Sequence, residues 1–136
     1  MKNNILPEVW GPHGWKFMHY VALGYPDLPT DTDKSAYQNF YESLRDVLPC
    51  QGCATHYKET ILQYPVKDHL QDRESLLRWS FEIHNTVNKR VGKPTLTYED
   101  ALQLYTKKQF PKVALFGKCV ILLFILLLVY YVYSRT

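Results

Sequence analysis

A long apolar segment near the end of the chain places the strongest limit on what this sequence can fold into. Residues 113–133 are almost wholly apolar, and only Gly117 and Lys118 interrupt them. A helix of that length spans roughly 30 Å, the hydrocarbon thickness of a bilayer. The alternative is a buried core helix, but the middle of the segment is apolar on every side, and a small domain seldom encloses such a rod. The sequence therefore predicts one domain over residues 1–112 and a C-terminal transmembrane anchor over residues 113–136.

Charges on the two sides of the apolar segment predict its orientation. Tyrosine rings prefer the headgroup layer, and the flank richer in Lys and Arg stays on the cytoplasmic side. We therefore expect a tail-anchored, single-pass membrane protein with a cytoplasmic main domain, because residues 1–10 contain no apolar stretch long enough for a signal peptide. The far side carries Tyr130, Tyr131, Tyr133 and Arg135, and the near side carries Lys107, Lys108, Lys112 and Lys118.

The composition of the chain is that of a folded domain. Charged residues make up 21% and hydrophobic residues 46%, which excludes the disordered class. The net charge is only +3 and the basic residues are scattered, so nucleic acid is not an expected partner. Aromatic residues reach 15%, which suggests that the domain stacks its rings against a bound ring system.

Apolar residues at steps of three and four, punctuated by proline and glycine, predict an all-α domain. Four helices and a short fifth suit a small four-helix bundle. Asp31 and Asp33 are candidate caps for the second helix, and Thr97 with Asp100 for the fifth. The expected helices cover residues 14–23, a stretch after the aspartates that Pro49 ends, residues 50–63, residues 72–91 and a short stretch after residue 97.

Two of the three cysteines lie in a motif that is a candidate redox pair, Leu48-Pro49-Cys50-Gln51-Gly52-Cys53. A helix N-terminus stabilises a thiolate, and two cysteines at this spacing can close a disulfide, which favours a redox pair. Zinc is an alternative, with His56 and either His69 or His84 as further ligands, although structural zinc sites usually bring two close pairs. Inert packing is a third interpretation. The chain lacks the βαβ pattern that thioredoxin-like chemistry would need.

Polar side chains of the fourth expected helix form a stripe. His84, Asn85, Asn88 and Lys89 lie at spacings of three to four residues. A dithiol pair needs an electron carrier, and the aromatic surplus points to a flavin, so this stripe is a candidate pocket lining. The alternative is an ordinary solvated helix face.

Three blocks of this sequence together resemble the small flavin-linked sulfhydryl oxidases of the ERV/ALR type, over most of residues 10–105. The resemblance implies a four-helix bundle with a short fifth helix, FAD at the mouth of the bundle, and usually a homodimer. It also implies a reaction in which two thiols become a disulfide and O2 becomes H2O2. The blocks are Trp10-Gly11-Pro12-His13-Gly14-Trp15 with His19, then Leu48-Pro49-Cys50-Gln51-Gly52-Cys53, and Trp79-Ser80-Phe81-Glu82-Ile83-His84-Asn85-Thr86-Val87-Asn88 with Lys93-Pro94.

The resemblance also implies roles for single residues. Cys53 is the cysteine next to the flavin and Cys50 the one that exchanges with substrate, which agrees with the need to hold the first rigidly while the second stays accessible. For His19 and His84, a core histidine bonded to backbone is the alternative. The implied cofactor-binding residues are Gly11, Pro12, Trp15, His19, Tyr57, His84, Asn85, Val87 and Asn88, with Arg90 and Lys93 near the phosphates.

The sequence departs from the cellular members of that family in its cysteines. Phe81 and Tyr98 stand at or near the two positions where those enzymes usually close a structural disulfide. A second cysteine pair that would relay electrons is also missing, and Cys119 alone cannot form one. The resemblance is therefore greatest to the compact forms of large cytoplasmic DNA viruses.

Those departures shape the expected function. We expect an oxidase on a host or virion membrane whose substrate is a thioredoxin-like carrier that supplies disulfides to virion proteins. Two other classes stay open from the residues alone: a tail-anchored zinc-binding adaptor without catalysis, and a structural membrane protein whose cysteine pair is incidental.

Overall fold

The computed structural model of this chain describes residues 4–106, 126–127, 131 and 133–134. The chain divides into two compact units, Met1–Ala101 and Leu102–Thr136. Nearly all of the anchor predicted over residues 113–133, and the predicted domain boundary at residue 112, lie outside the described residues. Among the residues that are described, no helix has both the length and the apolar content to span a bilayer.

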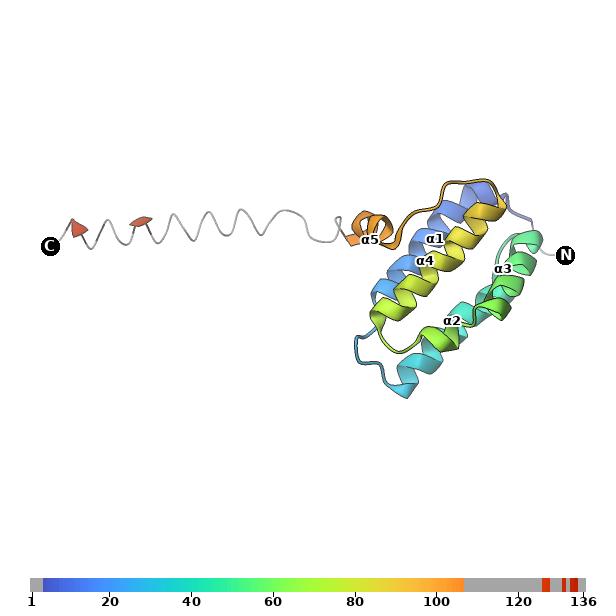
Figure 1. The fold of residues 1–136 in the computed structure, drawn as a ribbon, viewed down its shortest axis with the longest axis horizontal. Helices are drawn as coiled ribbons and strands as arrows, with labels where there is room; N and C mark the ends of the chain where they lie inside the picture. Colours follow the sequence, from blue (N-terminus) through green and yellow to red (C-terminus); the bar gives the residue numbers. More distant parts are fainter. Residues whose placement is uncertain (1–3, 107–125, 128–130, 132, 135–136) are drawn as a thin grey trace. The chain divides into compact units, whose positions relative to one another are not determined.

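The described part of the chain is all-α, as predicted. Figure 1 shows α1 lying beside α4 and α2 beside α3, with the short α5 following α4. The prediction of four bundle helices and a short fifth is confirmed there, and the structure adds one short 3-10 helix that the sequence pattern did not predict. The elements are α1 (Pro7–Leu23), α2 (Asp31–Val47), α3 (Gln51–Gln63), η1 (Val66–His69), α4 (Arg73–Arg90) and α5 (Tyr98–Thr106).

The first helix begins seven residues earlier than predicted. Pro12 and the flanking glycines indicated a helix start near residue 14, because proline inside a helix loses one hydrogen bond and crowds the preceding turn. The structure instead begins α1 at Pro7, the position in the first turn where proline costs nothing, and carries Pro12 inside the helix. The helix therefore brings Trp10 and Gly11 into the same element as Trp15 and His19.

Side-chain caps fix the starts of the other helices. The hydroxyl of Thr30 accepts from the backbone N–H of Asp33, and the Asp33 carboxylate accepts from the backbone N–H of Thr30, a reciprocal capping box. Asp31, predicted as a possible cap, lies instead in the first turn of α2. Asp72 caps α4, and Thr97 accepts from the backbone N–H of Asp100 at the start of α5, as predicted.

Replacing Thr30 with alanine is expected to lower the free energy of unfolding by about 1 kcal/mol, because the backbone N–H of Asp33 in the first turn of α2 loses its side-chain acceptor. Urea unfolding measures the change. Thr32→Ala is the matched control: Thr32 is exposed in the first turn of the same helix, so its replacement should change the free energy by less than about 0.5 kcal/mol. Equal losses in both variants would contradict the capping role.

Much of the aromatic surplus fills the core. Trp79, Tyr25 and Tyr41 are fully buried, and Tyr57 is nearly so. Their polar atoms donate to backbone carbonyls: Tyr41 Oη to Met18 at 2.8 Å, Tyr57 Oη to Tyr41 at 3.0 Å and Trp79 Nε1 to Tyr64 at 2.8 Å. A small bundle gains large buried areas from such rings once each polar tip has a partner. Packing in the core therefore explains a large share of the high aromatic content, which the sequence alone linked to ligand binding.

Candidate functional site

The cysteine motif forms a disulfide across the first turn of α3. Cys50 is the N-cap residue of this helix with extended backbone angles (φ −133°, ψ 120°), and its Sγ accepts from the backbone N–H of Cys53 at 3.2 Å. The Cα atoms of Cys50 and Cys53 are 5.1 Å apart, within the ordinary range for a disulfide. Pro49 stops the chain from continuing α2 into α3, so the pair stands at a helix start, where a thiolate is stabilised.

The two cysteines differ in exposure. Cys50 is buried, with 8% of its surface exposed, whereas Cys53 is half-buried. The backbone N–H of Ile5 donates to the carbonyl of Pro49 at 2.8 Å, so the segment of residues 4–6 is held against the cysteine turn. The expected order of accessibility is therefore wrong for this structure: Cys50, expected to be the accessible cysteine, is the more buried of the two, because it packs at the turn between α2 and α3.

A second cluster joins α1 to α4 through stacked rings. The ring centroids of Trp15 and His84 are 4.2 Å apart and their planes differ by 9°. His19, one turn after Trp15, places Nε2 at 2.9 Å from Nδ1 of His84 and Nδ1 at 2.7 Å from Oγ of Ser80. We call these three side chains the Ser80–His19–His84 network. His19 and His84 are 65 positions apart in the sequence, and the packing of α1 against α4 brings them together.

Both histidines of the network are uncharged at neutral pH. Burial, reinforced by His84, lowers the pKa of His19 to about 3. Burial, reinforced by the positive charge of Lys93, lowers the pKa of His84 to about 4. Each neutral ring carries one N–H, so a single proton lies between the two rings and Ser80 completes the chain. The result is a flat, uncharged stacking surface with a polar edge.

The free energy of unfolding is expected to fall as the pH is lowered from 7 to 5. The folded pKa of His19 lies below its unfolded value of 6.5, so the folded protein binds fewer protons. The contribution to stability is therefore complete above about pH 6.5 and is lost as the pH falls toward the folded value. For the fully buried His19 the loss is about 1.4 kcal/mol per pH unit, or about 2 kcal/mol at pH 5.

Urea unfolding at pH 7, 6 and 5 measures this slope. His56→Gln is a suitable control, because His56 is exposed and should leave the slope unchanged. Equal free energies of unfolding at pH 7 and pH 5 would contradict a network of buried neutral histidines.

The other predicted cofactor residues on α4 and after it have mixed positions. The Asn85 side chain donates to the carbonyl of Leu96 at 2.8 Å and accepts from its backbone N–H at 3.2 Å, so it anchors the loop before α5. Arg90 is exposed and lies 3.5 Å from Glu59 on α3. Three more residues complete the predicted set on this side: Val87 and Asn88 are half-buried, and Lys93 is exposed.

The predicted residues on α1 and α3 lie partly in the core. Tyr57 is buried with its hydroxyl bonded inside the bundle, while Gly11 is half-buried and Pro12 is exposed. Trp10, which belongs to the first block but was not among the predicted cofactor-binding residues, has a buried Nε1 donor with no hydrogen-bond partner in the described part of the chain. Such a donor is costly unless a partner reaches it, so it marks a place where a ligand acceptor fits.

The zinc alternative is not supported by the geometry. Cys50 and Cys53 are joined to each other, and His84 is stacked on Trp15 and bonded to His19. Within the described ranges, no group of three or more His, Cys, Asp or Glu side chains is placed to hold a metal ion.

Sequence reasoning missed Ser80 and the packing of Phe81. Ser80 is buried and lies four residues before His84, so the helical stripe drawn through His84 would have found it. Phe81 contacts the ring of His19 and meets Tyr98 edge-on with centroids 5.9 Å apart. An aromatic contact therefore joins the two positions at or near which the resemblance places a structural disulfide in other members. The Arg78 guanidinium also covers the Tyr98 ring at 3.7 Å.

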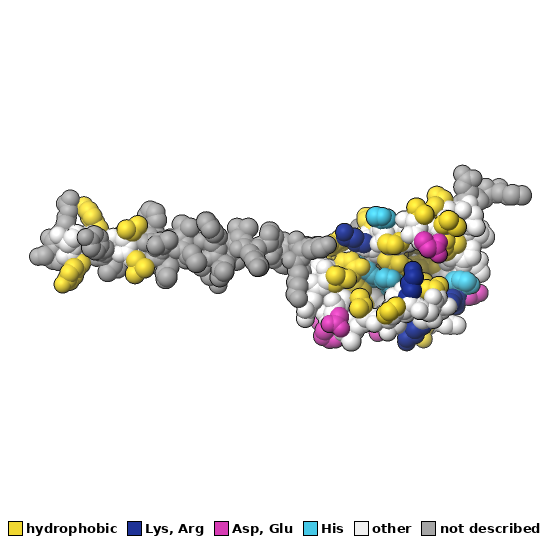
Figure 2. All heavy atoms as spheres, turned by 90° about the horizontal axis from the view of Figure 1, so that it is seen from above, with side chains coloured by type: hydrophobic (Ala, Val, Ile, Leu, Met, Phe, Trp, Pro, Cys, Tyr) yellow, Lys and Arg dark blue, Asp and Glu magenta, His cyan; other side chains and the backbone are white. Residues whose placement is uncertain are grey.

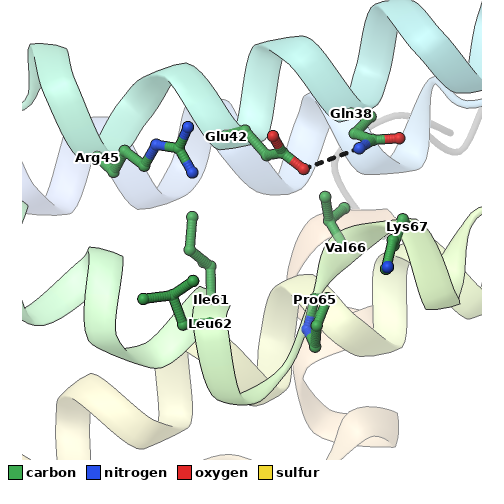
Figure 3. Close-up of a pocket in the computed structure, with 8 residues that line it drawn as sticks. All are labelled: Gln38, Glu42, Arg45, Ile61, Leu62, Pro65, Val66 and Lys67. Carbon is green, nitrogen blue, oxygen red and sulfur yellow. Dashed lines mark hydrogen bonds between the residues drawn. The ribbon is translucent and has the colours of Figure 1, made fainter.

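A pocket of about 300 Å³ opens between α2 and the α3–η1 segment, and none of the residues that line it is a predicted site residue (Figure 3). Its floor is apolar, formed in part by Ile61 and Val66, and Gln38 donates to Glu42 across its rim at 2.9 Å. Figure 2 shows a different kind of surface, on which histidine side chains lie among hydrophobic and basic ones. The cysteine turn and the α1–α4 cluster therefore contribute no residue to the lining of this pocket.

Comparison with known proteins gives a consistent result. The model of the Erv1/Alr family matches residues 12–111. A probable FAD-linked sulfhydryl oxidase of Acanthamoeba polyphaga mimivirus is 47% identical over 107 residues, which cover 78% of this chain and 75% of that protein. The FAD-linked sulfhydryl oxidase of African swine fever virus is 33% identical over 100 residues, covering 71% of this chain and 79% of that one.

A solved structure shares the fold. The crystal structure of the FAD binding domain of Erv1 from Saccharomyces cerevisiae superposes with a TM-score of 0.71 at 30% sequence identity, covering 79% of this chain and all of that one. The expected fold of the domain is thus shared with a solved structure that is described as an FAD binding domain.

Proposed function

Since the chain belongs to the Erv1/Alr family, we propose that its Cys50–Cys53 disulfide takes electrons from protein thiols and passes them through FAD to oxygen. The chain is an FAD-linked sulfhydryl oxidase, an oxidoreductase that forms disulfides. The observation that carries this conclusion is a disulfide closed across the first turn of a helix in a bundle that matches the Erv1 core.

The residues around Trp15 and His84 fit FAD. Their stacked, uncharged rings suit a flat ring system. The buried Nε1 of Trp10 can donate a hydrogen bond to an acceptor atom of the cofactor. FAD, when bound, accepts an electron pair from the dithiol and passes it to O2, giving H2O2. The residues proposed to hold it are Gly11, Pro12, Trp15, His19, Tyr57, His84, Asn85, Val87 and Asn88, with Arg90 and Lys93 toward the phosphates.

The protein's own step is thiol–disulfide exchange. A substrate thiolate attacks Sγ of Cys50, the bond to Cys53 breaks, and Cys53 leaves as a thiolate. A second substrate thiolate then attacks the substrate sulfur of the mixed disulfide, which releases a substrate disulfide and leaves Cys50 as a thiolate. Two electrons have passed to the cysteine pair, and the two substrate protons have gone to solvent. Cys53 is the proposed donor to the flavin because its position is fixed by the first turn of α3.

Oxygen consumption by the purified full chain tests the activity. With dithiothreitol as the only thiol, we expect one H2O2 formed for each disulfide made and each O2 consumed. A chain that retains FAD but consumes no oxygen under these conditions would contradict the proposed activity.

The proposed physiological substrate is a thioredoxin-like carrier. The sequence contains only one cysteine besides the redox pair, so the chain supplies no second pair to relay electrons from a bulky substrate. A reduced thioredoxin should therefore be oxidised with a lower KM than dithiothreitol. Equal KM values for the two thiols would argue against a carrier.

A homodimer is proposed from the exposed apolar side chains of α1. Phe17 is 60% exposed and meets Phe40 of α2 edge-on at 6.0 Å, and Val9 of the same helix is 63% exposed. Apolar side chains this exposed on one helix suit an interface between copies of the chain. Sedimentation should report a dimer that Phe17→Asp converts to a monomer, and a monomeric native chain would contradict it.

A cytoplasmic main domain on a tail anchor, in a host or virion membrane, is proposed from the lysines near the apolar segment. A glycosylation site introduced ahead of the bundle should stay unmodified in microsomes. Modification at that site would reverse the orientation.

A further inference from the structure

The backbone groups on the two sides of Cys50 are hydrogen-bonded to the N-terminal segment of the chain. The Pro49 carbonyl accepts from the backbone N–H of Ile5 at 2.8 Å, and the backbone N–H of Gln51 donates to Oδ1 of Asn4 at 3.1 Å. Between these two groups, Cys50 has extended angles. Residues 4–6 thus hold the cysteine turn at two points, one before and one after the cysteine.

This arrangement matches half of a parallel β-bridge. In such a bridge, an extended residue has its preceding carbonyl and following N–H bonded to the N–H and carbonyl of one residue on the other strand. Here Ile5 supplies the N–H, but the amide oxygen of the Asn4 side chain stands where a backbone carbonyl would bond Gln51. The segment therefore imitates a strand partner with groups from two different residues.

We propose that the Pro49 carbonyl and the Gln51 amide form the docking site for an extended substrate peptide, and that residues 4–6 occupy this site until the peptide displaces them. The inference rests on the proposed oxidase function. Addition of an extended peptide to free backbone groups is a general mode of peptide recognition. One peptide residue would supply both bonds, so the peptide replaces the two bonds of residues 4–6 one for one.

The pairing also places the substrate cysteine. Bridged residues of neighbouring strands direct their side chains to the same face of the pair. The peptide residue that bonds to both Pro49 and Gln51 is therefore the substrate cysteine itself. Its sulfur then lies on the same side of the pair as Cys50 Sγ. Cys50 is only 8% exposed with residues 4–6 in place, and displacement of this segment frees the backbone groups on both sides of this cysteine.

Two variants of Asn4 are expected to shift the exchange in opposite directions. Asn4→Ala removes the acceptor for Gln51 and loosens the segment, so the disulfide should react about fivefold faster with a cysteine peptide. Asn4→Asp keeps the acceptor and adds a negative charge at the N-terminus of α3, which should slow the reaction. Asn39→Ala, an exposed position on α2, is the matched control and should leave the rate unchanged.

The probe is an acetylated, amidated pentapeptide with one central cysteine, compared with the same peptide containing N-methylcysteine. The full chain is mixed with each peptide without oxygen, quenched with acid, and the mixed disulfide is counted by mass spectrometry. The N-methyl peptide lacks the N–H for Pro49 and should react about fivefold more slowly, after its reactivity is normalised to oxidised glutathione. The native rate for Asn4→Ala, or equal normalised rates for the two peptides, would overturn the inference.

The outcome is separable from that of the proposed function. Neither flavin reduction nor oxygen consumption enters this readout. A chain that consumes oxygen with dithiothreitol but shows no Asn4 effect overturns the docking site alone. A chain with the expected exchange rates but no oxygen consumption overturns the oxidase activity alone. Thermal unfolding of each variant establishes that the bundle is intact.

Discussion

Replacing Cys53 with serine is expected to reduce thiol-driven oxygen consumption by about 1,000-fold or more, while FAD stays bound. Serine cannot close the disulfide with Cys50, so the pair can no longer collect two electrons from substrate. The bundle should survive, because Cys53 is only half-buried and serine is similar in size. The measurement compares turnover per bound flavin, with flavin content taken from the absorption of the purified variant.

Two further cysteine variants sharpen this test. Cys50→Ser should lose activity to the same extent with protein thiols, since it removes the sulfur that exchanges with substrate. Cys119→Ser, the matched change at the remaining cysteine, should keep native turnover. Turnover by Cys53→Ser within tenfold of the native chain would show that the cysteine pair is not required for the activity.

Replacing His19 with alanine is expected to lower the free energy of unfolding by about 3 kcal/mol and to weaken the retention of FAD. His19 is fully buried, so its loss leaves a cavity beside Phe81 and deprives Ser80 and His84 of their shared partner. His84 is then free to turn away from Trp15, and the stacking surface loses its fixed geometry.

Urea unfolding and flavin content after gel filtration measure the two effects of His19→Ala. His56→Ala makes the same chemical change at an exposed position on α3 and should alter neither quantity appreciably. A His19→Ala chain as stable as His56→Ala, with native flavin content, would show that the Ser80–His19–His84 network is not part of the site.

Local sequence signals predicted the helices well where one side chain decides the outcome. Thr97 and Asp100 predicted the start of α5, because a capping pair three residues apart acts within a single turn. The start of α1 was missed for the opposite reason. Pro12 is a strong local breaker, and its tolerance inside the helix depends on the packing of α1 against α4, which no local pattern reveals.

The sequence singled out several residues that lie together in the structure, but it did not predict the contacts between them. The resemblance identified His19, His84 and the cysteine pair, and the structure shows the two histidines in direct contact. Asn85 shared the same stripe, yet its amide is used on Leu96, since an amide near a loop satisfies backbone groups wherever the fold supplies them. The contacts of Asn4 and Ile5 with the cysteine turn join positions more than 40 residues apart, and nothing in their local sequence signals them.

The most direct test of the central claim is an absorption spectrum of the purified full chain, recorded before and after anaerobic addition of dithiothreitol. We predict a flavin band near ~450 nm that bleaches with the dithiol, returns on admission of air, and stays unbleached in Cys53→Ser. Such a result joins the cofactor, the cysteine pair and the oxygen acceptor in one experiment. A colourless chain, or a flavin band that the dithiol reduces equally well in Cys53→Ser, would contradict the account.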